Sequence, residues 1–325
     1  MEVINITNLP PVNKEPLVLC LGQFDGLHRG HQYLLEQARQ LLELDDTLAV
    51  WSFNLHPPVM KEEDKIGLSL LTPVAERRNL LVSYGVKKLY EGPSFIDPAE
   101  FSLETFVLEQ AALLNVRQIV VGETFCVGNE SASSVEMLQQ LCNQIGTPVT
   151  VVPAIKYDGR AISSTTIREQ VKAGQVGLAN ELLGRHYTIQ GIVAHGNKIG
   201  RTLGFPTANL DHIDDYVEPS PGVYMGMTEI YDSKNDRMES WKCLISAGYR
   251  PTVGGKTYKV EAYLLDYSGD LYGQTISVSF VERLRGEIRF PSLDALIVQM
   301  HEDERKAREA FGMPTTRSVP VDSPL

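Results

Sequence analysis

The chain has 325 residues, of which 43% are hydrophobic and 22% charged, and its net charge at pH 7 is −11. This length predicts about two domains, and the composition is that of globular proteins with buried cores, which excludes collagen-like and low-complexity classes. The acidic balance argues against a general nucleic-acid binder, which needs basic surface to displace counterions, but it permits a locally positive site for small anions.

The cysteines and the N-terminal segment indicate a reduced protein without a membrane partner. The four cysteines lie far apart and form no CxxC pair, which argues against a zinc ribbon or a thioredoxin-like motif. The first ten residues lack the basic and apolar regions of a signal peptide, and no apolar run approaches the ~18 residues of a membrane span. We therefore expect a cytoplasmic protein that is a monomer or a weak oligomer.

Short apolar runs alternate with helical patterns in the first half of the chain. The runs predict strands over residues 17–21, 48–53, 86–90, 118–121 and 149–152. The spacing of apolar residues predicts helices over 32–44, 73–84, 103–114 and 135–145. This alternation indicates parallel βαβ units in an open, Rossmann-like α/β sheet. Ligands of such sheets bind at the carboxyl ends of the strands, where Gly22, Phe53 and Gly122 lie.

Two histidines, His28 and His31, stand where the first strand turns into the first helix. Gly26 and Gly30 let the backbone pass close to a ligand, and the free N–H groups of a helix N-terminus suit a phosphate. Histidines at such a place can donate to a phosphoryl oxygen as charge builds on it. The alternative is a pair of surface or capping histidines, which a bare HxxH pattern would favour; the strand-to-helix context favours the functional interpretation.

The segment Ile162–Arg168 predicts a second phosphate-binding helix start. Ser163, Ser164 and Thr165 can cap a helix whose first turns carry Arg168. Hydroxyls, free N–H groups and a guanidinium together suit a polyphosphate. The alternative is an ordinary N-cap with a solvated arginine, which the pattern in isolation favours.

The pattern changes after about Leu183. Short β-rich runs, separated by turn signals, predict strands over 187–193, 223–230, 241–246, 258–265 and 275–280. Strands of this length and spacing are typical of a small antiparallel barrel. A closing helix is expected over 293–311, with a solvated polar face from His301 to Glu309. We therefore expect domains at 1–184 and 185–312, followed by a flexible tail at 313–325.

A glycine-containing loop, Gly200–Leu210, leads into the barrel. Thr207 and Asn209 are two residues apart, so both point to one face of an extended segment. Their oxygens can hold Mg²⁺, which takes few protein ligands and keeps several waters. A turn followed by a strand, with local hydrogen bonds from Thr and Asn, fits the same residues equally well.

Several of these segments resemble known signatures. Gly22–His31 resembles the HxGH signature of nucleotidyltransferases, which attack the α-phosphorus of a nucleoside triphosphate and release pyrophosphate. Phe53–Pro57 and Ile162–Arg168 resemble the F-x-P-H-P and ISSTxIR segments of a narrower family. Gly200–Leu210 resembles the signature of riboflavin kinases, and this match continues through Pro221–Tyr224, Gly248–Thr252, Val260–Glu261, Leu264–Gly273 and Leu284–Arg285. The sequence is thereby identified as similar to the prokaryotic bifunctional riboflavin kinases/FMN adenylyltransferases, also called FAD synthetases.

The resemblance implies that the barrel phosphorylates riboflavin to FMN with Mg-ATP and that the α/β domain adenylylates FMN to FAD. Glu261 would be the base for the kinase reaction, whereas without the family it would be read as a solvent-facing strand residue. Thr207 and Asn209 would bind the metal. The other implied site residues are the catalytic His28, His31 and Arg168, the nucleotide-binding Gly22, Phe24, Asp25, Gly30, Ser163, Ser164, Thr165, Gly200 and Gly204, and the flavin-binding His56, Pro57, Thr124, Phe125 and Arg285, the last of which fits a surface ion pair equally well.

The chain departs from the family pattern in both halves. Thr124 replaces an Asp or Asn, Val127 replaces an aromatic residue, and no Lys or Arg occurs in Asn129–Ser134, which is usually basic. Leu55 replaces a proline, and Ser246 stands where Asn is common. The first of these departures, in Val121–Ser134, touches the flavin side of the adenylylation site. The departures leave two alternatives: a paralogue that keeps one of the two activities, and a flavin-binding regulator without turnover.

Overall fold

The computed structural model describes residues 1–7, 9–53, 69–92, 102–126, 134–196, 200, 203–232, 235–252 and 255–315. The chain divides into two compact units, Met1–Ser164 and Thr165–Leu325. This division lies earlier in the chain than the predicted boundary at 184/185, because helix α6 (Val176–Leu183) packs on strands of the barrel. In the described ranges, no helix is long and apolar enough to cross a membrane.

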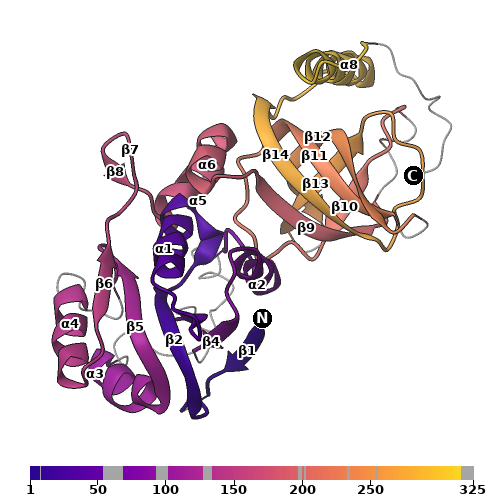
Figure 1. Ribbon diagram of the computed structural model, residues 1–325. Coiled ribbons are helices and arrows are strands. Elements are labelled where there is room, and N and C mark those ends of the chain that lie inside the picture. Colours follow the sequence, from indigo (N-terminus) through magenta and orange to yellow (C-terminus); the bar gives the residue numbers. More distant parts are fainter. Residues whose placement is uncertain are drawn as a thin grey trace. The chain divides into compact units, whose positions relative to one another are not determined.

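A six-stranded sheet forms the centre of the first unit, with the strand order β1-β4-β3-β2-β5-β6 (Figure 1). Every neighbouring pair in it is parallel, as the alternation of strands and helices predicts. Its strands are β1 (Glu2–Asn5), β2 (Asn13–Gly22), β3 (Thr47–Ser52), β4 (Lys88–Glu91), β5 (Leu114–Gly122) and β6 (Val149–Val152).

Helices cover both faces of this sheet. Side chains alternate along β2, so that Val18 and Cys20 pack with α1 (Arg29–Gln40) and α2 (Val74–Ser83). The alternate residues of β2 face the helical turns α3 (Leu103–Thr105), η3 (Phe106–Gln110) and η4 (Ala111–Leu113), and helix α4 (Ser134–Gln144). The single helix predicted over 103–114 was therefore wrong in part. The segment is three short turns, and Leu114 already belongs to β5 because it pairs with Asn13 of β2.

The described part of the second unit contains a closed barrel with the strand order β10-β13-β12-β11-β14-β9 (Figure 1). Its antiparallel pairs confirm the predicted barrel. The strands are β9 (Tyr187–Ala194), β10 (Ala208–Asp211), β11 (Gly222–Asp232), β12 (Arg237–Thr252), β13 (Gly255–Leu264) and β14 (Thr275–Gly286). Strand β10 was not among the strands predicted from the apolar runs, because it has only four residues, but the alternative of a turn followed by a strand at Thr207 and Asn209 agrees with it. A small hairpin, β7 (Lys156–Tyr157) and β8 (Arg160–Ala161), precedes helix α5 (Ser164–Lys172).

Helix α8 (Leu293–Ala310) packs on the outside of the barrel through Met300 and Ala307. The prediction that its polar face is solvated holds for His301, Arg305, Lys306 and Glu309 but was wrong for three charged residues. Asp303, Glu304 and Arg308 are buried, and Arg308 is fully covered. Its guanidinium donates to Glu304 at 3.0 Å and to Asp266 at 2.6 and 3.0 Å. These hydrogen bonds, with Asp266 first, raise the pKa of Arg308 against the opposing effect of burial. Polar residues on this face thus hold the helix to the barrel.

Candidate functional site

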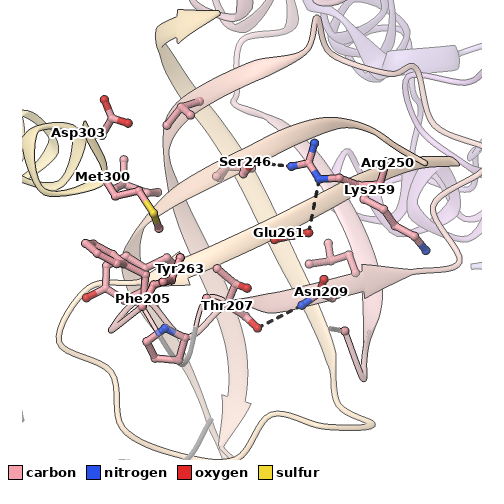
Figure 2. A pocket seen from close by; sticks show the side chains of 18 of the residues that line it. Phe205, Thr207, Asn209, Ser246, Arg250, Lys259, Glu261, Tyr263, Met300 and Asp303 are labelled. Atoms are coloured by element: carbon pink, nitrogen blue, oxygen red, sulfur yellow. Dashed lines mark hydrogen bonds and ion pairs between the residues drawn. The ribbon is translucent and has the colours of Figure 1, made fainter. Parts of the chain in front are cut away.

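A cavity of about 700 Å³ lies against the outer wall of the barrel and is bordered by helix α8 (Figure 2). Helix α8 contributes Leu296, Met300 and Asp303 to its lining. Strands β10, β12 and β13 contribute a polar floor, and the loop before β10 closes one side with Phe205 and Thr207. An apolar wall that faces a few polar groups is the usual form of a small-molecule site.

Three polar side chains form a row across the floor of this cavity. In the register of the strands, Asn209 of β10 pairs with Glu261 of β13, and Glu261 pairs with Ser246 of β12. Cross-strand partners point to the same face of a sheet. The residues on either side of Glu261, Val260 and Ala262, are fully buried, so the Glu261 side chain points outward into the cavity. Glu261 thus lies on the outer face of its strand, as the solvent-facing alternative expected, but this part of the outer face lines a cavity.

Thr207 and Asn209 lie together at one end of this row (Figure 2). Asn209 Nδ2 donates to the Thr207 carbonyl at 3.3 Å, which holds the Asn209 amide beside Thr207. Gly196 and Gly200 let the backbone approach both residues. A Cβ at Gly196 would lie 2.7 Å from the Asn209 amide, and one at Gly200 would lie 2.4 Å from the carbonyl oxygen of Phe205, two residues before Thr207.

These residues fit Mg²⁺, because the donors are oxygens and the metal takes few protein ligands. The described residues include no group of three or more His, Cys, Asp and Glu that could hold a metal. A magnesium site here would therefore rest on a hydroxyl and an amide oxygen, together with oxygens from substrate phosphates and water.

Arg285 lies on the α8 side of the cavity and is held by an ion pair. Its Nε donates to both carboxylate oxygens of Asp303, at 2.9 and 3.1 Å, and its Nη2 lies 2.7 Å from Asp303 Oδ2. The guanidinium also lies over the Phe290 ring, 5.8 Å from its centroid. Arg285 is therefore ion-paired and also lines the cavity, while its contact with flavin stays a prediction.

The loop before β10 is shaped by its glycines. Gly204 has φ 82°, which favours glycine, and the amides of Leu203 and Phe205 both donate to the Gly200 carbonyl. This turn places the Phe205 ring against Tyr263, with ring centroids 5.3 Å apart. Gly200 and Gly204 thus shape the wall that carries Thr207.

In the first unit, the two histidines lie at the carboxyl end of β2, as predicted. His28 is the N-cap of α1, and its Nδ1 accepts from the backbone amide of His31 at 3.4 Å. The two rings stack with centroids 3.8 Å apart. A Cβ at Gly30 would lie 3.1 Å from the His28 ring, so glycine leaves that ring its place. Burial, followed by the charge of His28, lowers the pKa of His31 well below 6.5.

Asp25 holds the histidine loop in shape. It is 1% exposed, and its carboxylate accepts from the amides of Leu71 and Thr72, at 3.1 and 3.0 Å, and from the Thr72 hydroxyl at 3.2 Å. Phe24 and Leu27, on either side, have positive φ angles of 55° and 37°, which these contacts help to maintain. The structure thus gives Asp25 the place of a loop support rather than of an open ligand.

The remaining residues predicted for adenylylation lie near strand ends of the first unit or in helix α5, whose first residue ends the first unit and whose other residues belong to the second. Ser164 begins α5, and its Oγ donates to the Asp25 carbonyl at 2.9 Å, whereas Arg168 lies one turn further along this helix. Thr124 is exposed in the turn after β5, and Phe125 packs against Phe53, with ring centroids 6.3 Å apart. His56 and Pro57 lie outside the described residues. Gly22 ends β2, and Phe24, Gly30, Ser163 and Thr165 adjoin these segments.

Three charged residues of the cavity were not predicted: Arg250, Lys259 and Asp303. Lys259 is two residues from Glu261 on the same strand, so the alternation of side chains could have placed it on the same face. Arg250 falls within the Gly248–Thr252 match, which was noted without a role for the arginine. Asp303 lies on the helix face that was expected to be solvated.

Comparisons with known proteins agree with the division of the chain into a parallel α/β unit and a barrel unit. The riboflavin kinase family model matches residues 183–311, and the FAD synthetase family model matches residues 11–166. A crystal structure titled as a macrolide-efflux protein from Streptococcus pneumoniae shares the fold, with a TM-score of 0.81 and 29% identity over 95% of this chain and 99% of that chain.

Curated relatives match over nearly the whole length. The bifunctional riboflavin kinase/FMN adenylyltransferase of Bacillus subtilis is 34% identical over 96% of this chain and 98% of its own, and that of Escherichia coli K12 is 33% identical over 95% and 97%. A Listeria monocytogenes FAD synthetase is 35% identical over 73% of this chain and 92% of its own. The full-length matches and the two family models agree with the barrel and the parallel sheet described above, and the chain therefore belongs to the family of bifunctional riboflavin kinases/FMN adenylyltransferases.

Proposed function

We propose that the cavity on the barrel is the riboflavin kinase site and that Glu261 is its base. The observation that carries this assignment is the row of Asn209, Glu261 and Ser246, which sets a carboxylate beside the oxygens of Thr207 and Asn209. Glu261 would take the proton of the riboflavin 5′-hydroxyl as that oxygen attacks the γ-phosphorus of ATP. The bond between the γ-phosphorus and the bridging oxygen then breaks, and ADP leaves.

Magnesium bound by Thr207 and Asn209 would neutralise phosphate charge during this transfer. The apolar side of the cavity, with Phe205, Tyr263 and Met300, suits the flat ring system of a flavin. Arg285, fixed by Asp303, would border this ring, and the Gly200–Gly204 turn would face the nucleotide.

For the first unit, we propose that the histidine loop holds the triphosphate of a second ATP. A phosphate oxygen of FMN would attack the α-phosphorus, and pyrophosphate would leave. His31, neutral near pH 7 because of its lowered pKa, and His28 would donate to the phosphoryl group, and the free amides at the start of α1 would face phosphate. Ser163, Ser164, Thr165 and Arg168 would bind the leaving polyphosphate, while Thr124 and Phe125 would border the flavin.

Product analysis with two separate substrates tests both assignments. The protein is given riboflavin plus Mg-ATP, or FMN plus Mg-ATP, and FMN and FAD are separated by chromatography. Glu261→Gln should lower FMN formation by about 10²- to 10⁴-fold, the usual contribution of a general base, and should spare FAD formation from supplied FMN. His31→Gln should do the reverse. Loss of both reactions in either variant would contradict two separate sites.

The same assay decides whether one activity has been lost. Thr124, in place of Asp or Asn on the flavin side of the adenylylation site, favours a chain that keeps only the kinase activity. The similarity to the Listeria FAD synthetase favours a chain that keeps only adenylylation. A paralogue with one activity would convert one of the two substrates and leave the other unchanged. Tight flavin binding without any turnover would instead support a regulator.

Location and assembly follow from the same proposal. Both reactions consume ATP, which places the enzyme in the cytoplasm, and its charge of −11 disfavours nucleic acid as a partner. We expect a monomer or weak oligomer, which light scattering across a range of protein concentrations would test.

A further inference from the structure

Arg250 lies beside the row of polar side chains on the floor of the kinase cavity. It is on the same strand as Ser246, four residues further along, so both side chains point to the same face. Its Nε lies 3.9 Å from Glu261 Oε1. Figure 2 shows the guanidinium reaching over from β12 toward Glu261 on β13. Among the described residues, Arg250 is the charged group that contacts the Glu261 carboxylate.

The guanidinium is held from two further sides. Nη2 donates to Ser246 Oγ at 3.0 Å, and Nη1 lies 3.3 Å from Glu287 Oε1. Gly248 leaves room for this contact, because a Cβ there would lie 2.3 Å from Glu287 Oε1 and 3.4 Å from Arg250 Nη1. Each terminal nitrogen of Arg250 therefore has a protein partner, and Nε lies on the side of the Glu261 carboxylate, within ion-pair distance.

We propose that Arg250 is a positioning residue for the kinase reaction: it fixes the Glu261 carboxylate, and Ser246 anchors it in that position. This inference rests on the proposed role of Glu261 as base. Oε1 is the oxygen paired with Arg250 Nε, at 3.9 Å, so in this proposal Oε2 is left to take the proton of the riboflavin hydroxyl. A general base must lie within hydrogen-bond reach of the proton that it takes, so a carboxylate free to rotate loses part of its effect.

The position of Ser246 explains why a short hydroxyl suits this chain. Ser246 is the cross-strand partner of Glu261, and its hydroxyl accepts the hydrogen bond from Arg250 beside it (Figure 2). Ser246 stands where asparagine is common in the family pattern. At this position, a residue that departs from the family pattern contacts the arginine that lies beside the proposed base.

The contacts of Arg250 argue against a direct hold on ATP. An arginine that binds phosphate presents its two terminal nitrogens to the ligand as a fork. Here Nη2 already donates to Ser246 and Nη1 to Glu287, so both terminal nitrogens are directed at protein partners. The positive charge acts on the reaction through Glu261, and its effect is expected in kcat rather than in KM.

The test measures FMN formation at saturating riboflavin and Mg-ATP for Arg250→Gln, Arg250→Lys and Ser246→Ala. Arg250→Gln should lower kcat by about 10- to 100-fold, since a misplacement of the order of 1 Å can cost about 100-fold. The KM values for riboflavin and Mg-ATP should stay within about twofold of the wild type. Arg250→Lys, which keeps the charge, should recover part of the loss, and Ser246→Ala should show a smaller loss in kcat.

The decisive comparison repeats Arg250→Gln in the Glu261→Gln background. If Arg250 acts through Glu261, the second substitution should change the residual kcat by less than about twofold, because the group that it positions is already gone. A further loss of tenfold or more, or a rise in the KM for Mg-ATP, would overturn the proposal and indicate direct contact with substrate. An unchanged kcat in Arg250→Gln would also overturn it.

Controls separate this inference from the proposed function and from misfolding. Arg237→Gln removes another arginine of β12, whose ion pair with Glu239 lies outside the cavity, and should leave kcat unchanged. Adenylylation of supplied FMN should be unaffected in every variant. If Glu261→Gln alone keeps full kinase activity, the proposed role of Glu261 fails. If Glu261→Gln is inactive and Arg250→Gln is normal, only the positioning role fails.

Discussion

The two candidate sites of this chain are built in opposite ways. The histidine site of the first unit is one continuous loop, from Phe24 to His31, with positive φ angles, a buried aspartate and stacked rings. The kinase site is a row of side chains from three strands on the outer face of a barrel whose interior is filled by other residues. In the first site, the residues that maintain the loop are also those proposed to contact the substrate. In the second site, the side chains that fill the barrel and those proposed to react point to opposite faces of the strands.

This difference predicts how each site responds to substitution. A change in the histidine loop should cost stability and activity together, because the loop needs its buried contacts to hold the rings. A change in the row at Glu261 should cost activity with little loss of stability, because its side chain is 26% exposed and contributes nothing to the barrel interior. Separate measurements of stability and turnover can therefore test whether the two sites differ in this way.

The largest expected effect on stability lies in the barrel, away from the reactive row. Arg308→Met leaves the carboxylates of Glu304 and Asp266 without their buried partner. Breaking such a pair by removing one member costs about 3 kcal/mol or more. Calorimetry should show the barrel transition lowered by roughly 6–12 °C, with the first unit unchanged.

Arg305→Met is the matched control for Arg308→Met. Arg305 lies on the same helix and also pairs with two carboxylates, those of Glu302 and Glu309, but on the exposed face. Exposed pairs contribute little to stability, so this variant should melt close to the wild type. Equal losses in the two variants would mean that the network around Arg308 is no more important than a surface pair.

The next effect tests whether fold and chemistry are joined in the histidine loop. Asp25→Asn keeps the size of the side chain, but its amide nitrogen cannot accept from the donors of Leu71 and Thr72. Leaving buried donors unsatisfied should lower the stability of the first unit by about 2 kcal/mol. Adenylylation should fall with it, while the kinase reaction should be spared.

Trp51 makes this measurement specific to the first unit. The chain has two tryptophans, and Trp51 is 1% exposed in the core of the first unit. In a Trp241→Phe background, urea unfolding followed by fluorescence reports on that unit. Asp45→Asn, an exposed aspartate after α1, is the control. Full stability with lost adenylylation in Asp25→Asn would separate fold from chemistry here and contradict the comparison.

Much of both sites could be predicted from the sequence, for reasons that differ between them. The histidine loop is contiguous, so its motif and its place between a strand and a helix are visible in one segment. The kinase site depends on register: nothing local shows that Asn209, Ser246 and Glu261 become neighbours, and only the resemblance brought Asn209 and Glu261 together. Arg250 and Asp303 were missed because their roles depend on partners in other elements.

The fold shows the same limit. Alternation and periodicity predicted the parallel sheet and the barrel, because these patterns reflect which side chains are buried. They failed at helix α8, where Asp303, Glu304 and Arg308 are buried as charged partners of one another and of the barrel. A rule that places charged residues in solvent cannot find a buried ion network, since the pairing depends on Asp266 and Arg285, which are distant in the sequence.

A smaller effect tests the close packing of the histidine rings. Gly30→Ala adds a Cβ that would lie 3.1 Å from the His28 ring and should push that ring from its place against His31. Adenylylation should fall by about tenfold, in keeping with the sensitivity of catalysis to small displacements. Gly177→Ala, where a Cβ meets nothing within 4 Å, should leave adenylylation unchanged. Normal adenylylation in Gly30→Ala would show that the His28 ring can move aside without loss of function, against the close packing that its contacts indicate.

The smallest effect concerns the pH dependence of stability in the first unit. The pKa of His31 is lowered well below 6.5, first by burial and then by His28, whereas the unfolded chain keeps a histidine pKa near 6.5. Below pH 6.5 the unfolded state therefore binds a proton that the folded state does not bind, and the free energy of unfolding falls as the pH falls. One such group can contribute at most about 1.4 kcal/mol per pH unit. Urea unfolding followed through Trp51 between pH 7.5 and 5.5 should show this slope, and His31→Gln should reduce it. An unchanged slope in His31→Gln would mean that the ring takes up its proton in the folded loop, and that the loop is less closed to solvent than its buried contacts imply.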